Sequence, residues 1–281
     1  MRFRKMERKD VPSGLSLCRS ATWNQLSRDW EIFLTLDPEG SRVCVDDDEN
    51  VIGTVTTLRY SNHFSWIGMV LVDPAHQRKG IGLKLLEQAL EILKNEDSVK
   101  LDATPAGRQV YVKLGFKDEY SLSRMSTASL NTQHLVASTA TPLEQNDLDS
   151  VKLLDQKVFG ADRLPLLRWM MEGAPDLAFK VGKGKQLKGY CFGRPGYRFT
   201  QIGPVVAMDV DVAKELVSAA LMHCGNKPMI LDVPYHDEAW NTWISLLGFS
   251  ELRPFVRMYK GKNNWPGVPG NQYAILGPEF G

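Results

Sequence analysis

Strand-like and helix-like patterns of apolar residues alternate along the first 125 residues of the chain. Apolar or β-branched runs predict strands at residues 2–6, 41–45, 51–59, 66–72, 99–103 and 117–125. The run 66–72 is almost wholly apolar, which is typical of a strand covered on both faces. Helices are expected at residues 11–20, at about 24–36, through Leu83, Leu86, Leu90 and Leu93, and at about 110–114.

The second half of the chain repeats this order. Gly248-Phe249 and Arg257-Met258 match Gly115-Phe116 and Arg124-Met125, both 133 positions later (248 against 115 and 257 against 124). Leu231-Asp232 likewise matches Leu101-Asp102, at a slightly shorter offset. One long-range repeat indicates a duplicated domain, since solenoids need several short repeats. We therefore expect a first domain at residues 1–128 and a second at 129–281.

The segment between the apolar strand and the third helix is suited to bind an anion. It reads Gln77-Arg78-Lys79-Gly80-Ile81-Gly82. The first N–H groups of a helix lack partners within the helix, and the helix dipole places partial positive charge there. Two glycines let the backbone approach a diphosphate closely, and two cations flank the same position. The chain lacks the patterns G-x-x-x-x-G-K-[ST] and G-x-G-x-x-G, which lowers the case for ATP or NAD.

The overall composition argues against several function classes. The 34 Lys and Arg nearly balance the 33 Asp and Glu, so no strong field attracts nucleic acid. The sequence holds no apolar run of about 18 residues and no leader-like start, so we expect neither a membrane nor an export signal. Four widely separated cysteines show no metal-binding spacing, and free thiols suit the cytoplasm. We expect a cytoplasmic protein without a metal site.

Two motifs of the first copy resemble motifs of a known protein family. The run from Val72 to Gly82 resembles the acetyl-CoA signature of the GNAT N-acetyltransferase superfamily, and the segment from Tyr111 to Phe116 matches that family's Tyr-x-x-x-Gly-Phe. The resemblance covers roughly residues 2–125. It implies an α/β (α+β) fold of two GNAT-like domains, each a mixed, mostly antiparallel twisted sheet with helices on both faces. Together with the repeat, it suggests a tandem GNAT protein with an active first copy and a degenerate second copy.

The resemblance also implies a role for each matching position. The backbones of Leu71 and Val72 would pair with the pantetheine arm of acetyl-CoA, and one of their N–H groups would stabilise the tetrahedral oxyanion. Tyr111 would lie near the thioester sulfur as the general acid. The residues that would hold the pyrophosphate are Gln77, Arg78, Lys79, Gly80, Ile81 and Gly82.

The second copy departs from this pattern. At the place of the anion-binding segment it reads Gly203 to Asp211, where Asp209 and Asp211 would repel a diphosphate. At the place of Tyr111 it has Ile244. We therefore expect this copy to bind CoA poorly and to act as a scaffold or on the substrate side.

The general base is the least defined part of the site. A Lys-like amine with a pKa near ~10.4 is neutral in about one molecule in 10³ at pH 7, so a base or a water chain must remove its proton. The strand 66–72 offers no Glu, Asp or His. Asp102 and, from the second copy, Asp232 and His236 are the candidates, and a water relay is an equal alternative. Trp23 or Trp30 could line the acceptor pocket.

The leading expectation is acetyl transfer from acetyl-CoA to a primary amine of a small molecule, by a monomer or a homodimer. Two alternatives stay open at this point. One is acetylation of a protein lysine or N-terminus. The other is a non-catalytic acyl-CoA-binding regulator, against which the presence of Tyr111 only in the copy with the anion-binding segment already argues.

Overall fold

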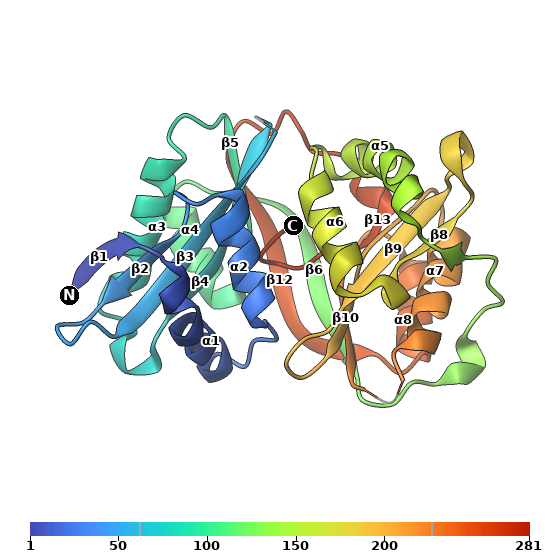
Figure 1. The fold of residues 1–281 in the computed structure, drawn as a ribbon, viewed down its shortest axis with the longest axis horizontal. Coiled ribbons are helices and arrows are strands. Elements are labelled where there is room, and N and C mark those ends of the chain that lie inside the picture. Colours follow the sequence, from blue (N-terminus) through green and yellow to red (C-terminus); the bar gives the residue numbers. More distant parts are fainter. Residues whose placement is uncertain (62, 226) are drawn as a thin grey trace.

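The computed structural model describes residues 1–61, 63–225 and 227–281, and the arrangement of its elements is shown in Figure 1. Its α-helices are α1 Val11–Ser20, α2 Ser27–Leu36, α3 Ile81–Ile92, α4 Pro105–Lys113, α5 Leu148–Phe159, α6 Leu164–Gly173, α7 Val210–His223 and α8 Glu238–Leu246. Its strands are β1 Arg2–Lys5, β2 Arg42–Val45, β3 Val51–Tyr60, β4 Phe64–Val72, β5 Ser98–Ala103, β6 Lys117–Thr127, β7 Thr141–Pro142, β8 Phe179–Val181, β9 Gly189–Arg194, β10 Thr200–Ala207, β11 Met229–Pro234, β12 Ser250–Gly261 and β13 Gln272–Ala274.

All strands join in one continuous sheet, in the order β1-β2-β3-β4-β5-β12-β6-β11-β10-β9-β8-β7, with β13 paired to β10. Among the strand pairs of the described residues, only β4–β5 and β10–β11 are parallel, so the sheet is mixed and mostly antiparallel. Helices cover both faces, which confirms the fold class expected from the sequence.

The two copies exchange their last strands at the centre of the sheet. The strand β12, from the end of the second copy, pairs with β5 of the first copy on one side and with β6 on the other. The strand β6, which ends the first copy, pairs in turn with β11 of the second. Figure 1 shows β12 beside β6 between the two halves. The division after residue 128 stays a prediction, and a cut there would take β12 away from β5.

The helices pack on the sheet in three main apolar clusters. One contains α3 with the back of β2 to β5, and another contains α7 and α8 with the strands of the second copy. The largest cluster joins α1 and α2 of the first copy to α5 and α6 of the second, through residues such as Trp30 and Trp169. The two halves therefore share one apolar core beneath these four helices.

The C-terminal segment runs through the junction between the halves, where Figure 1 marks the C-terminus. The Tyr60 hydroxyl donates to the Phe280 carbonyl at 2.6 Å, and the Trp66 indole N–H donates to the Pro278 carbonyl at 3.0 Å. A Cβ atom at Gly68 would lie 2.6 Å from the Glu279 carbonyl oxygen, so β4 needs a glycine where this segment crosses it. The segment thereby fixes Glu279 against the middle of β4.

Most elements expected from the sequence are present, although the helix expected at about 110–114 begins earlier, at Pro105. Two further differences concern α2 and α3. The second helix begins at Ser27 and not near Asn24, because Asp29 accepts from the N–H of Leu26 and caps the helix start there. Leu83 is 41% exposed and does not belong to the buried face of α3, which is formed instead by Ile81, Leu85, Leu86 and Ala89. All four cysteines are free and buried, as expected.

Candidate active site

The strands β4 and β5 diverge shortly after they meet. They pair only at Ser65 with Val99 and at Trp66 with Lys100. Beyond that point a bulge bends β4, since the register with β3 shifts and Met69 has a φ of 51°. The Thr54 hydroxyl donates to the Met69 carbonyl at 2.8 Å and holds this backbone in place. A gap between two neighbouring strands therefore opens in the middle of the sheet.

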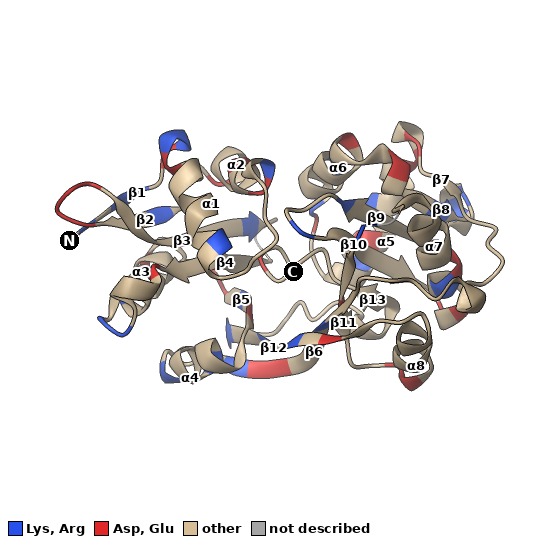
Figure 2. Ribbon diagram, turned by 90° about the horizontal axis from the view of Figure 1, so that it is seen from below, with Lys and Arg blue, Asp and Glu red and all other residues tan. Residues whose placement is uncertain are grey.

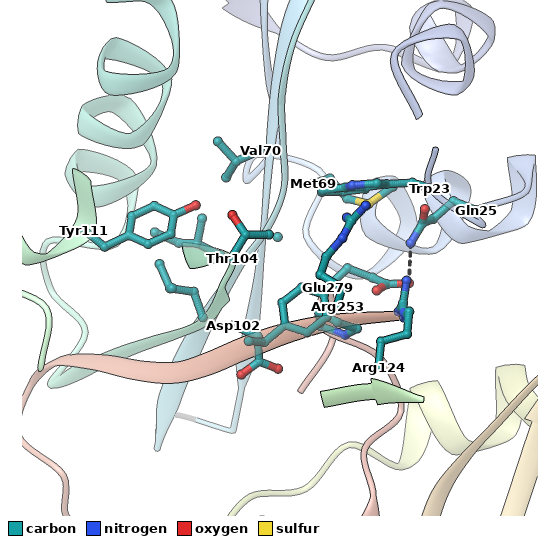
Figure 3. Close-up of a pocket in the computed structure, with 15 residues that line it drawn as sticks. Trp23, Gln25, Met69, Val70, Asp102, Thr104, Tyr111, Arg124, Arg253 and Glu279 are labelled. Atoms are coloured by element: carbon teal, nitrogen blue, oxygen red, sulfur yellow. Dashed lines mark hydrogen bonds between the residues drawn. The ribbon is translucent and has the colours of Figure 1, made fainter. Parts of the chain in front are cut away.

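A pocket occupies this gap and the space in front of it (Figure 3). Its enclosed volume is about 80 Å³. The residues that line it come from both copies and from the C-terminal segment: Trp23, Gln25, Ile67, Gly68, Met69, Val70, Leu101, Asp102, Thr104, Tyr111, Arg124, Arg253, Phe255, Pro278 and Glu279. The exchanged strands thus build part of the wall.

The anion-binding segment forms the loop between β4 and α3. Gly80 is the N-cap of α3 with a φ of +81°, and Arg78 also has a positive φ of 61°. A Cβ atom at Gly80 would meet no other atom within 4 Å, and one at Gly82 would meet only Val72 Cγ2 at 3.5 Å. The protein itself therefore leaves the space in front of both glycines open. Figure 2 shows basic segments in the loop that precedes α3.

The backbone after the bulge offers hydrogen bonds to this gap. The Asp73 N–H donates to the Ile52 carbonyl of β3 at 2.9 Å. Because N–H groups of successive strand residues point to opposite sides, the Val72 N–H faces away from β3 and the Leu71 N–H faces toward it. The Gln77 side chain donates to the Val72 carbonyl at 3.3 Å and ties the loop to the strand. Of the two candidates on β4, Val72 is the one whose amide faces the gap.

The second copy has lost the corresponding loop. Eight residues, 73–80, separate β4 from α3, whereas only Met208 and Asp209 separate β10 from α7. The Asp209 carboxylate accepts from the Val212 N–H at 2.9 Å and occupies the start of α7. Ile244, at the place of Tyr111, is fully buried in α8. An internal carboxylate here takes the position that an anion would need.

Tyr111 lies on α4 at the edge of the gap, with its ring against Gly107 and Phe116. Figure 3 shows its hydroxyl directed toward Val70 and Thr104. Among the described residues this hydroxyl has no hydrogen-bond partner. Burial raises the pKa of Tyr111 to about 12, so the hydroxyl stays protonated throughout the neutral range. The wall of the pocket therefore presents an O–H donor that no described residue engages.

Two family models match the chain, one to each copy. The model described as "Acetyltransferase (GNAT) family" matches residues 7–116, and the model described as "Acetyltransferase (GNAT) domain" matches residues 151–274. The chain is a tandem GNAT protein.

Relatives and solved structures agree with this assignment. The holothin acyltransferase of a Pseudoalteromonas strain is 27% identical over 242 residues, covering 85% of this chain and 81% of its own. The uncharacterized N-acetyltransferase YitH of Bacillus subtilis is 25% identical over 284 residues, covering 99% of this chain and 97% of its own. A putative acetyltransferase from Pyrococcus horikoshii has the same fold, with a TM-score of 0.83, 24% identity and coverage of 100% and 95%. This tandem GNAT protein is an acyltransferase, and acyl-CoA is the co-substrate of its family.

Two acidic residues that the sequence suggested for catalysis lie in buried ion pairs of this tandem GNAT protein. Both oxygens of Asp102 accept from Arg257 at 2.9 Å, and both oxygens of Asp232 accept from Arg124 at 2.8 Å. Burial raises the pKa of Asp102, against the attraction of Arg257. Asp102 lines the pocket, whereas Asp232 reaches it only through Arg124. The structure does not bring these two acids together with Tyr111 around one point.

Several polar residues of the pocket did not stand out in the sequence. Glu279 comes from the C-terminal segment, Gln25 from the loop before α2, and Arg253 from the exchanged strand β12. They are distant along the chain, and no local motif surrounds them. Trp23 also lines the pocket, while Trp30 is buried in the core. The signals for this region in the sequence were Trp23 and the repeat of Arg124 at Arg257.

No helix within residues 1–61, 63–225 and 227–281 is both long enough and apolar enough to cross a membrane.

Proposed function

We propose that the chain transfers an acetyl group from acetyl-CoA to a primary amine of a small molecule, in the pocket of the first copy. One observation carries the proposal. One pocket joins the gap between β4 and β5, with Tyr111 on its wall, to a chamber of polar side chains from both copies and from the C-terminal segment. The second copy lacks the loop that precedes α3 in the first copy, and Asp209 caps the start of its helix α7. The described residues therefore form one co-substrate site, in the first copy.

The start of α3 would hold the diphosphate of the co-substrate. The amides between Arg78 and Gly82 are at a helix N-terminus, where partial positive charge favours anions. The two side chains Arg78 and Lys79 are exposed on the same loop and add formal charge. The Val72 amide, which faces the gap, would then pair with the pantetheine arm as a neighbouring strand would.

Acyl transfer needs one bond to form and one to break. The amine nitrogen attacks the thioester carbon, the C–N bond forms, the C–S bond breaks, and the nitrogen loses one proton while the thiolate gains one. Tyr111 would donate a hydrogen bond to the departing sulfur. Because a thiol has a pKa near ~8.5 and Tyr111 one of about 12, full proton transfer from Tyr111 is uphill by roughly 5 kcal/mol. The hydroxyl therefore acts best as a donor that stabilises the thiolate until the amine's proton reaches it.

The removal of the amine's proton is assigned to water. The pocket's two carboxylates are Asp102 and Glu279, and both are held by arginines. A paired carboxylate is a weak base for an ammonium group. We propose that Asp102 and Asp232 position their arginine partners, and that proton loss proceeds through water in the pocket.

A small acceptor fits this chamber better than a protein side chain. Its polar groups include Gln25, Arg124 and Glu279, which are all more than nine-tenths buried. A lysine side chain carries only a methylene stem and one amine into a pocket, and would offer no acceptor to Nη1 of Arg124, which Asp232 does not use. The free Tyr111 hydroxyl favours catalysis over a purely regulatory role.

The proposal is tested by following CoA release from acetyl-CoA with a panel of amines and of lysine-containing peptides. Gly82→Asp should abolish both acetyl-CoA binding in calorimetry and CoA release, because the added carboxylate meets the diphosphate. Gln88→Asp, two turns further along α3, adds the same charge away from the loop and should bind normally. Normal acetyl-CoA affinity of Gly82→Asp would refute the assigned site.

A further inference from the structure

The chamber in front of β4 contains polar atoms that the described residues leave unmatched. The side-chain oxygen of Gln25 is buried and accepts no hydrogen bond. Arg124 uses Nε and Nη2 for Asp232, and its Nη1 has no partner among the described residues. Arg253 is half-buried, and among the described residues its one hydrogen bond is donated to the Thr22 hydroxyl, at 3.4 Å. Buried polar atoms normally have partners, so the oxygen of Gln25 points to a ligand, and the unused Nη1 of Arg124 and the half-buried Arg253 offer donors on the same side of the pocket.

These atoms lie on one side of the pocket. Figure 3 shows Gln25, Arg124, Arg253 and Glu279 together, opposite Tyr111. Gln25 donates to one oxygen of Glu279 at 3.0 Å, and the other oxygen of Glu279 has no hydrogen-bond partner among the described residues. The chamber therefore presents two acceptors, on Gln25 and Glu279, beside two guanidinium donors.

The charges of this cluster balance. Arg124 is paired with Asp232, and Arg194 with both Asp29 and Glu279. With Arg253 the cluster contains three guanidinium groups and three carboxyl groups. A ligand that is neutral overall but carries one charge of each sign would keep that balance while it satisfies both kinds of unmatched atom.

Arg253 is the member of the cluster that has no ion-pair partner among the described residues. Burial and the neighbouring Arg124 lower the pKa of Arg253, and the attraction of Asp232 offsets this effect only in part. A planar carboxylate accepts from guanidinium groups in a forked geometry, and such charge-assisted bonds are stronger than neutral ones.

We propose that the acyl acceptor is an amine that also carries a carboxylate, such as a free amino acid. Arg253 and Nη1 of Arg124 bind the carboxylate, and the oxygens of Gln25 and Glu279 accept from the amine and direct its nitrogen toward the thioester beside Tyr111. This inference rests on the proposed acetyl transfer and names its acceptor class.

The test uses matched pairs of amines that differ only in the carboxylate: glycine and methylamine, β-alanine and ethylamine, L-phenylalanine and 2-phenylethylamine. CoA release from acetyl-CoA is measured with the full chain. At least one acid should exceed its decarboxylated partner in kcat/KM by about tenfold or more. Arg253→Gln should reduce that ratio by about 10- to 100-fold, the range expected for a lost charge-assisted hydrogen bond. Arg253→Lys should retain part of the ratio, and Arg8→Gln, an exposed arginine outside the pocket, all of it.

The outcomes separate this inference from the transfer reaction itself. Turnover of amines with no preference for a carboxylate would overturn the acceptor class and leave the transferase intact. If no amine is acetylated although acetyl-CoA binds, the transferase proposal fails. Calorimetry of the three acids with the CoA-loaded protein then decides the inference: binding that Arg253→Gln weakens supports it, and absence of binding overturns it.

Discussion

Arg124 and Asp232 belong to different copies, and they face each other through two hydrogen bonds of 2.8 Å with no exposure of the carboxylate. Arg257 and Asp102 repeat this pair in the opposite sense, at 2.9 Å. Each arginine lies on an exchanged strand, and each aspartate lies on a strand of the other copy. The duplication has thus placed one buried ion pair on each side of the strand exchange.

These pairs should stabilise the junction only while both members are present. Asp232→Ala leaves Arg124 charged and buried, and we expect a loss of about 3–5 kcal/mol in the free energy of unfolding. The double variant Asp232→Leu with Arg124→Met removes both charges and should recover most of that loss. Denaturant-induced unfolding measures both values. A loss below about 1 kcal/mol for Asp232→Ala would contradict the pairing.

The aspartates should not act as proton acceptors in the reaction. Asp102→Asn is expected to lower the free energy of unfolding. The acidic limb of the pH profile of kcat/KM should stay at the same pH, because the amine's proton leaves through water. Measurements from pH 6 to 10 on the folded variant check this. A limb that disappears in Asp102→Asn would identify Asp102 as the general base instead.

Tyr111→Phe should affect the chemical step and not the binding of the co-substrate. We expect kcat to fall by about 10²-fold, the scale of losing one preorganised hydrogen-bond donor to a developing negative charge. The Kd for acetyl-CoA should stay within about threefold, because the Tyr111 ring remains. Rapid single-turnover measurement of CoA release, with calorimetry beside it, gives both numbers. Equal kcat in the two proteins would exclude this role.

The same residue predicts the shape of the alkaline pH profile. The pKa of Tyr111 is raised to about 12, so its protonated form is favoured in the folded protein; the resulting stabilisation is present below pH 10 and is lost as the pH rises toward 12. Below about pH 11, ionisation of Tyr111 should therefore cause no fall in kcat. A descending limb near pH 9 that is absent from Tyr111→Phe would contradict this.

The first copy should not fold as an isolated fragment of residues 1–128. Such a fragment lacks β12, so the edges of β5 and β6 lose their common partner, and it lacks the C-terminal segment that packs on β4. We expect no cooperative unfolding transition and no acetyl-CoA binding by the fragment alone. A mixture with residues 129–281 should restore binding. A stable fragment that binds acetyl-CoA would show that the exchange is dispensable.

The co-substrate half of the proposed site stands out in the sequence because its residues are contiguous. A strand, a glycine-containing loop and a helix follow each other between residues 66 and 92, and the unpaired amides at a helix start follow from local geometry alone. Tyr111 was found through its short segment ending at Phe116. In the same way, the loss of the loop in the second copy was visible as Asp209 in place of a glycine-containing segment.

The sequence by itself determined the duplication, the strand and helix order, and the position of the open helix start. Only the tertiary structure decided the strand exchange, the engagement of Asp102 and Asp232 by arginines, and the meeting of Gln25, Arg253 and Glu279 in one chamber. The physical reason is the range of the interactions. Helix starts and turns depend on neighbouring residues, whereas strand pairing and buried ion pairs join positions more than 100 residues apart, whose register is set by the packing of the whole sheet.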